Sequence, residues 1–302
     1  MILCVGEILA DMIGTYRDGA FYYERKAGGA PFNVACGIKK FGGRAIFAGS
    51  VGEDLIGDFL IKYAEEKGFD DLSIEKLPDR NTTLAFVQLD ESGERSFCFY
   101  RKNTADYRLP EIAEEVLKKA DMVLIGSLML SEDCGFEYAK RLAARAKALK
   151  KTVCFDVNFR TDIFRDRQVA FSRYCALLEE SDIVKMSEDE VEIFGEKYLS
   201  ERLSDKLLCI SLGSNGSEWR YRGKSGKVKT IKVDAVDTTG AGDAFFAGVL
   251  SGLDGKGEYT DELLNKTFAR ANVCGALNTL GRGAIDALPD EEAIKAELKK
   301  II

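Results

Sequence analysis

Residues 237–248 read Asp237-Thr-Thr-Gly-Ala-Gly-Asp243-Ala-Phe-Phe-Ala-Gly248, a polar loop with two glycines that runs directly into an apolar helical stretch. The glycines let backbone N–H groups converge on an anion, and the N-terminus of the following helix adds about half a positive charge. A carboxylate beside such a site is electrostatically unfavourable. Asp243 fits there if it faces a hydroxyl and removes its proton while the backbone holds a phosphoryl group.

Two other glycine-loop interpretations of this segment are excluded, and one remains. No GxxxxGK[ST] pattern occurs in the sequence, so the loop is not a Walker A motif. Phe245 stands where a dinucleotide fingerprint has its third glycine. A simple helix cap after a glycine turn stays open as an alternative role for Asp243.

Outward from this loop, apolar runs of strand length alternate with longer amphipathic stretches, which is the pattern of βαβ units and a parallel sheet. The C-terminal third is helical. The predicted strands cover residues 2–5, 45–51, 121–126, 152–157, 182–186 and 207–212. The first predicted helix starts at residue 30 and ends at the glycines at 42–43. Another lies between the strands at 152–157 and 182–186. The remaining predicted helices cover residues 54–67, 132–150, 241–253, 261–279 and 290–300.

Two segments interrupt this alternation and predict a second, smaller sheet. Residues 83–90 and 95–101 alternate as strands around Glu91-Ser-Gly-Glu94, which indicates a hairpin, and residues 21–25 form a short aromatic strand. We therefore expect one α/β domain over residues 1–302: a doubly wound, mostly parallel sheet flanked by helices, with a small β-sheet lid. The lid strands come from about 12–27 and 80–106, close on a ligand, and are candidates for a homodimer contact because edge strands seek partners.

Composition excludes several classes of function. The sequence contains no His, which removes His-based triads and HExxH zinc sites and leaves a carboxylate, Lys, Tyr or Cys as general base. Its eight cysteines form no CxxC pair, so small buried hydrophobes are the expectation for them. A net charge of −7 with dispersed Lys and Arg argues against nucleic acid. Neither a signal peptide nor a membrane-length apolar run is visible, so we expect a cytoplasmic protein.

A second informative segment is Ala27-Gly-Gly-Ala-Pro-Phe-Asn33-Val-Ala-Cys-Gly. Its paired glycines permit close backbone approach, and Asn33 on the following helix offers a donor and an acceptor together. Asp11 follows the first strand, at the end of a parallel sheet where ligands gather. A carboxylate with an amide is suited to vicinal hydroxyls, although each residue alone could be an ordinary turn or surface group.

Together the two segments resemble the two motifs of the PfkB, or ribokinase-like, carbohydrate kinases. The layout from the opening Val-Gly-Glu to Gly283-Ala-Ile-Asp-Ala-Leu-Pro289 is also similar, so the resemblance covers essentially the whole chain. Within the family the sequence is most similar to fructokinases. The matching residues are Gly-Gly-Ala-Pro-Phe-Asn-Val-Ala at 28–35, Phe99-Tyr100-Arg101 with Ala105-Asp106, Asp156-Val-Asn158-Phe-Arg160 and Ala271-Asn-Val-Cys-Gly-Ala276.

This resemblance implies a ribokinase-like fold and ATP-dependent transfer of the γ-phosphoryl group to a primary hydroxyl of a small carbohydrate, D-fructose first. Asp243 would be the base, and the N–H groups of Gly240, Ala241 and Gly242 would stabilise the transferred group. The sugar ligands would be Asp11, Gly29, Asn33, Arg101, Asn158 and Arg160. ATP would contact Lys185, Ser187, Ser211, Gly213, Gly216 and Asn272. Glu190 would order Mg²⁺ through water, and Asp237 and Thr239 match positions that often ligate K⁺.

Several alternatives stay open at this point. A 2-keto-3-deoxygluconate kinase would use Arg101 and Arg160 to clamp a carboxylate, but that group tends to have Tyr where this chain has Phe99. Ribose and nucleosides are further candidate substrates, and a non-catalytic sugar sensor is the alternative from another class. Two departures from the family pattern are Ser187, where Asn is common, and Ile163-Phe164, where fructokinases often have Leu-Trp.

Overall fold

The computed structural model describes residues 1–89 and 95–301. Nine strands form the main sheet, in the order β13-β12-β11-β10-β9-β8-β1-β4-β5. All of its pairings are parallel except β11 with β12 and β12 with β13. The strands are β1 (Ile2–Val5), β4 (Ala45–Gly52), β5 (Asp71–Leu77), β8 (Met122–Ile125), β9 (Thr152–Asp156), β10 (Ile183–Ser187), β11 (Leu207–Ser211), β12 (Ser217–Tyr221) and β13 (Lys224–Val228).

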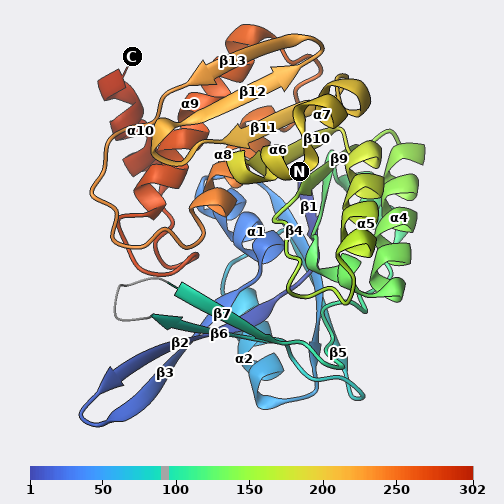
Figure 1. Cartoon of the computed structure of the whole chain (residues 1–302), viewed down its shortest axis with the longest axis vertical. Coiled ribbons are helices and arrows are strands. Elements are labelled where there is room, and N and C mark those ends of the chain that lie inside the picture. The colour runs from blue at the N-terminus through green and yellow to red at the C-terminus, as the bar shows by residue number, and fades with distance from the viewer. Residues whose placement is uncertain (90–94, 302) are drawn as a thin grey trace.

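Helices cover both faces of this sheet (Figure 1). They are α1 (Ala30–Lys40), α2 (Leu55–Glu65), α3 (Glu114–Lys119), α4 (Asp133–Ala148), α5 (Arg167–Glu180), α6 (Glu188–Phe194), α7 (Glu196–Arg202), α8 (Ala241–Leu253), α9 (Asp261–Asn278) and α10 (Glu291–Ile301), with short 3₁₀ turns η1 (Leu128–Ser131) and η2 (Gly213–Asn215). No helix among the described residues combines the length and the apolar character needed to cross a bilayer.

Strand β1 lies where the strand order reverses. From β1 the chain builds outward through β4 and β5 on one side and through β8, β9, β10 and β11 on the other. In open α/β sheets, ligands bind beyond the carboxyl ends of the strands at such a reversal. The residues that follow β1 and β8 are therefore placed at the expected site.

Two hydrophobic cores lie on the two faces of the sheet. One packs α1, α8 and α9 against it, with Phe32, Phe246 and Phe268 fully buried. The other packs α4 and α5 against it, with Phe155 and Tyr174 fully buried. Because β1 contributes Ile2 and Cys4 to one core and Leu3 and Val5 to the other, it reads as a continuous apolar run.

The smaller sheet has the order β3-β2-β6-β7 and projects from one side of the body (Figure 1). Its strands are β2 (Leu9–Arg17), β3 (Ala20–Gly28), β6 (Leu84–Leu89) and β7 (Arg95–Tyr100). Strand β2 pairs antiparallel with β3 and parallel with β6. The expected hairpin at 83–101 is thus present as β6 and β7, while its turn at 91–94 lies outside the described residues.

Most expected elements are confirmed, and α8 has the expected bounds. Strand β5 was not predicted, and β2 and β3 fill the expected lid segment at 12–27, with β2 beginning earlier, at Leu9. The basic run at 222–229 has the composition of a solvated turn, but Lys224–Val228 pairs antiparallel with β12 as an edge strand. The expectation that all cysteines are core residues also fails, because Cys98 and Cys134 are exposed.

Candidate active site

A cavity of about 680 Å³ opens where the main sheet, the small sheet and the glycine loop meet. It lies beside β1, at the carboxyl ends of the central strands, as the reversal of strand order requires. The expected site residues that line it are Asp11, Gly29, Asn33, Asn158, Arg160, Lys185, Asp237, Thr239, Gly240, Gly242 and Asp243. Residues from both motifs and from the smaller sheet therefore share one cavity.

The glycine loop begins α8 in a geometry that only glycine tolerates. Gly240 is the N-cap, with a φ of 77°, and a Cβ there would come 2.5 Å from the Cα of Ala284. The amide of Ala241 donates to the carbonyl oxygen of Thr238 at 3.2 Å, and Ala241 is not among the cavity-lining residues. The Ala241 amide is thus occupied within the turn, while Gly240 and Gly242 line the cavity where the anion site is predicted.

Asp243 lies in the first turn of α8 and faces the cavity. Its Oδ2 accepts a hydrogen bond of 2.8 Å from Nδ2 of Asn33 on α1. Burial raises the pKa of Asp243 above its ordinary value, against the lowering effects of the Lys185 charge, the Asn33 hydrogen bond and the Arg160 charge. A carboxylate with a raised pKa is a stronger base than an exposed one, which suits removal of a hydroxyl proton.

Lys185 brings a buried positive charge to the loop. Its Nζ lies 3.0 Å from Oδ1 of Asp156, and a Cβ on Gly242 would come 3.1 Å from that Nζ. Burial lowers the pKa of Lys185, but Asp156, Glu190 and Asp243 more than offset this, so the ammonium stays charged. Burial raises the pKa of Asp156 to about 7 despite the Lys185 charge. The cation is therefore held next to the expected phosphoryl position.

Asp11 on β2 reaches the cavity because Gly28 has no side chain. A Cβ on Gly28 would lie 2.2 Å from Oδ2 of Asp11. Burial and the neighbouring Asp243 raise the pKa of Asp11 to about 7, and Arg160 opposes that shift. Gly29, with a φ of 114°, is the N-cap of α1 and allows the backbone to pass Glu7 closely, since a Cβ would lie 2.4 Å from the Glu7 carbonyl oxygen.

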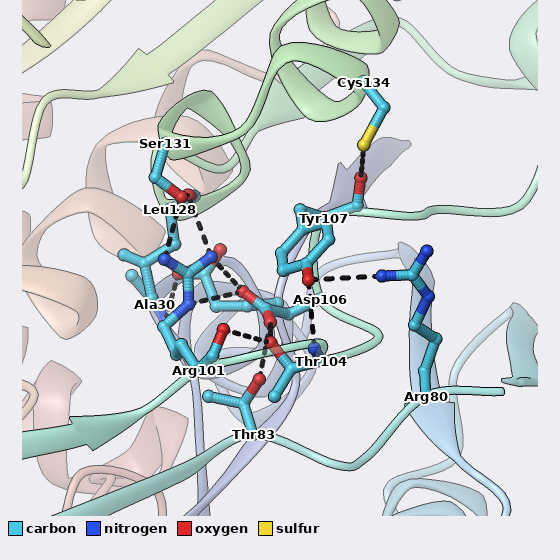
Figure 2. Close-up of polar contacts among 11 residues, drawn as sticks. Ala30, Arg80, Thr83, Arg101, Thr104, Asp106, Tyr107, Leu128, Ser131 and Cys134 are labelled. Atoms are coloured by element: carbon cyan, nitrogen blue, oxygen red, sulfur yellow. Dashed lines mark hydrogen bonds and ion pairs between the residues drawn. The ribbon is translucent and has the colours of Figure 1, made fainter. Parts of the chain in front are cut away.

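Arg101 is not among the residues that line the cavity. Its guanidinium is buried and pairs with Asp106, and it also donates to Ser131 Oγ at 2.9 Å and to the Leu128 carbonyl oxygen at 3.1 Å (Figure 2). The family resemblance implies a sugar ligand here. In the structure its charge has a partner, Asp106, five residues along the chain.

Apart from Lys185, the residues expected at the nucleotide and its metal ion are not among those that line the cavity. Ser187 and Glu190 make a capping box on α6: Ser187 Oγ accepts from the Glu190 amide at 3.2 Å, and Glu190 accepts from the Ser187 amide at 2.7 Å. Glu190 also accepts from the Phe159 amide at 2.6 Å. Ser187 therefore caps α6, a role that its short hydroxyl side chain can fill although the family commonly has Asn at this position.

The remaining nucleotide candidates bind the backbone or allow turns. Asn272 on α9 donates to the carbonyl oxygens of Val228 and Lys229 at 2.9 and 3.3 Å. Ser211 donates to the Met186 carbonyl oxygen at 3.3 Å. Gly213 and Gly216 adopt φ values of 56° and 96° around η2, beside the end of β11.

Asp237 braces the entry to the glycine loop. Its Oδ1 accepts from the Thr239 amide at 2.8 Å and its Oδ2 from the Gly283 amide at 3.0 Å. Asn278 donates to the Thr239 carbonyl oxygen at 3.0 Å. Over residues 1–89 and 95–301, no group of three or more acidic or Cys side chains could hold a metal by itself. A metal ion at this site would thus need oxygen ligands from a phosphate or water.

Some cavity residues were missed from the sequence. Glu7, Leu9, Leu128 and Thr238 line the cavity, and so does Phe99, which was considered only for its missing hydroxyl. Glu7 is fully buried directly beyond β1, and its position after an apolar strand is the signal that could have found it. The apolar residues carry no such signal, because a Leu in an apolar run looks the same in a core and in a cavity wall.

The fold and the site, with a buried carboxylate in the first turn of α8 beside a glycine loop, are those expected of a kinase. The model of the pfkB family carbohydrate kinases matches residues 1–291, and the chain belongs to that family. It is a carbohydrate kinase with a ribokinase-like α/β fold, acting as a phosphotransferase.

Relatives and solved structures agree with this family. The chain is 35% identical over 319 aligned positions to probable fructokinase-6, chloroplastic, of Arabidopsis thaliana, covering 100% of this chain and 83% of that protein. It is 34% identical to fructokinase-1 of Zea mays, covering 99% and 98%. A fructokinase from Xylella fastidiosa with bound ATP superposes with a TM-score of 0.91 at 29% identity, over 99% and 98% of the two chains. A fructokinase from Vibrio cholerae O395 with fructose, ADP and calcium gives 0.87 at 28% identity, over 98% and 97%.

Proposed function

We propose that this kinase transfers the γ-phosphoryl group of ATP to a primary hydroxyl of D-fructose. The proposal is supported above all by the hydrogen bond between Asn33 and Asp243, which joins the two motifs in one cavity with Asp11. Relatives named fructokinases, one of them solved with fructose and ADP, support the choice of sugar. A non-catalytic sensor would have no use for a buried basic carboxylate at an anion site.

In the proposed mechanism Asp11, Gly29 and Asn33 hold sugar hydroxyls, together with Asn158 and Arg160 from the end of β9. Asp243 removes the proton of the hydroxyl that attacks, and its raised pKa favours that transfer. The amides around Gly240 and Gly242 and the charge of Lys185 stabilise the phosphoryl group as its charge spreads.

The residues at this cavity fit a nucleoside triphosphate and a divalent ion. The free end of α8 with its glycines and the Lys185 ammonium suit phosphate oxygens. In this proposal Glu190 holds a water of a Mg²⁺ ion, which when bound would neutralise phosphate charge. Asp237 and Thr239 are proposed at a K⁺ site, and stimulation of turnover by KCl over choline chloride tests that assignment.

The alternative acid substrate, 2-keto-3-deoxygluconate, is less well supported. Its carboxylate would need both predicted arginines, and the guanidinium of Arg101 already has Asp106, Ser131 and Leu128 as partners. Phe99 adds no hydroxyl to the cavity wall. These contacts favour a neutral sugar over an acidic one.

We further propose a homodimer through the smaller sheet, which acts as a lid. A chain of ring contacts crosses all four of its strands. Each ring touches the next in the series Tyr16, Phe21, Tyr23, Phe86 and Tyr100. Tyr16 is 65% exposed and Tyr100 61%. Such an exposed aromatic face is typical of an interface. Sedimentation of wild type and of Tyr16→Ser tests it: the proposal requires a dimer that the variant weakens.

A substrate panel tests the catalytic proposal. ADP release is measured with ATP, Mg²⁺ and fructose, glucose, ribose, adenosine or 2-keto-3-deoxygluconate in turn. Fructose should give the highest kcat/KM. Higher kcat/KM with the sugar acid would replace the substrate, and sugar binding without ADP release at any Mg²⁺ concentration would replace catalysis by sensing.

A further inference from the structure

The buried pair of Arg101 and Asp106 joins the smaller sheet to the body. Arg101 directly follows β7, and both side chains are almost fully buried, with 7% and 1% exposed. Nε of Arg101 donates to Oδ2 of Asp106 at 2.8 Å, and a second guanidinium nitrogen bonds the same oxygen. The resulting fork fixes the guanidinium plane, which a single contact would leave free to turn.

The other oxygen of Asp106 binds the two segments that flank the β6–β7 hairpin. Oδ1 accepts from Thr83 Oγ1 at 2.5 Å and from Thr104 Oγ1 at 2.6 Å. Thr83 directly precedes β6, and its carbonyl oxygen also accepts from the amide of Ala10 on β2 at 3.1 Å. One carboxylate therefore ties together the points at which β6 enters and β7 leaves the smaller sheet.

The guanidinium extends this link to the wall of the cavity. Its contacts with the Leu128 carbonyl oxygen and with Ser131 Oγ hold η1, which follows the central strand β8 (Figure 2). The side chain of Leu128 lines the cavity and packs in a small cluster with Leu9, with Phe99 against it. Arg101 thus holds the backbone behind the apolar wall and is not itself among the residues that line the cavity.

We propose that Arg101 is a positioning residue for sugar binding: through Asp106 and the Leu128 carbonyl it holds the root of the lid against η1, so that Phe99 and Leu128 form the wall that the sugar meets. This inference deepens the proposed function and rests on it. It assigns Arg101 no contact with the substrate. The strength of this pairing supports the proposal. Burial raises the pKa of Asp106, but the charge and hydrogen bonds of Arg101 and the two threonine hydroxyls outweigh burial, so the pKa lies below its ordinary value.

The test compares four variants with wild type: Arg101→Met, Asp106→Asn, the double variant and Arg101→Lys. Arg101→Met and Asp106→Asn should each raise the sugar KM about tenfold while kcat and the ATP KM stay within about twofold, because a wall displaced by a fraction of an ångström weakens sugar binding only. Arg101→Lys keeps the charge but not the fork, and should recover part of the loss. Arg108→Met is the matched control, since its bond to Asp79 is exposed.

The double variant decides how Arg101 acts. If Arg101 works through Asp106, the double variant should show the same sugar KM as either single variant, because the two changes remove one interaction. It also removes both buried charges together, so it stays informative where a single variant fails to fold.

Three results would overturn the proposal. An unchanged or lower sugar KM in Asp106→Asn, with a raised one in Arg101→Met, would make Arg101 a direct sugar ligand. A double variant whose rise in sugar KM equals the product of the two single rises would also make Arg101 a direct sugar ligand. A lower kcat at unchanged KM would indicate loss of folded enzyme alone. The KM values of the variants are compared with that of wild type for the sugar that wild type turns over fastest in the panel. If fructose is not the substrate, the wild-type panel shows this before any variant is tested.

Discussion

Asn33 on α1 donates a 2.8 Å hydrogen bond to the carboxylate of Asp243 on α8, and this contact joins two motifs that lie 210 residues apart in the sequence. Helices α1 and α8 pack against each other on the same face of the main sheet, so the bond is held by a core contact as well as by its own geometry. The amide thus fixes the orientation of the proposed base.

Replacing Asp243 by Asn should abolish turnover while ATP binding persists. The amide keeps the shape but cannot accept a proton, and loss of a general base costs about 10³-fold in kcat. A coupled ADP assay gives kcat, and equilibrium titration gives ATP affinity. Asp234→Asn, a change at an exposed position before the loop, is the control. Near-normal turnover in Asp243→Asn would remove Asp243 from the mechanism.

Replacing Asn33 by Leu should make the enzyme more sensitive to acid. The hydrogen bond from Asn33 lowers the pKa of Asp243, so its loss should raise that pKa further and move the acid limb of the kcat profile to higher pH. Activity at pH about 6 should therefore fall more than activity at pH about 8. An acid limb at the wild-type position would show that Asp243 is not the group that titrates.

Much of this arrangement could be predicted from the sequence because it depends on local patterns. The apolar run of β1 and the glycine loop before α8 each specify their own structure, and both lie at the reversal of strand order. Asp11, Asn33 and Asp243 reach the same cavity for that reason.

The partner of a buried side chain depends on contacts between distant segments, and those could not be predicted. The pairing of Arg101 with Asp106 requires Thr83 and η1 to meet around them, which the spacing of the two residues does not reveal. Edge strand β13 is similar: its basic run looks like a turn until β12 offers it a ladder of backbone bonds.

Replacing Gly28 by Ala should weaken sugar binding selectively. A Cβ would lie 2.2 Å from Oδ2 of Asp11, so the carboxylate has to move, and a shift of that size raises the sugar KM by about 10- to 100-fold. The ATP KM should stay unchanged. Gly257→Ala adds a methyl group where no atom lies within 4 Å and serves as control. Equal sugar KM values in the two variants would contradict a role for Asp11 in binding.

Replacing Glu7 by Gln should make stability less dependent on pH. Glu7 is fully buried, and its Oε1 accepts from the Ala30 amide at 3.2 Å, while Oε2 has no hydrogen-bond partner among the described residues. Burial, with a smaller contribution from the Asp106 charge, raises the pKa of Glu7 from 4.5 to about 8, against the lowering effects of backbone hydrogen bonds and of the Arg101 charge. Between those values the folded protein keeps a proton that the unfolded chain has released, so stability falls as the pH rises through that range.

Gln has the shape of the protonated acid and no charge, so the variant should lose this contribution, which is about 1 kcal/mol per pH unit for one group. Urea unfolding of wild type and Glu7→Gln at several pH values between about 5 and 8 measures the difference in slope. Wild type should lose more stability than the variant across that range. The exposed Glu75→Gln gives the control slope, which should equal that of wild type. Parallel slopes for wild type and Glu7→Gln would mean that Glu7 is ionised in the folded protein, with its charge balanced by Arg101.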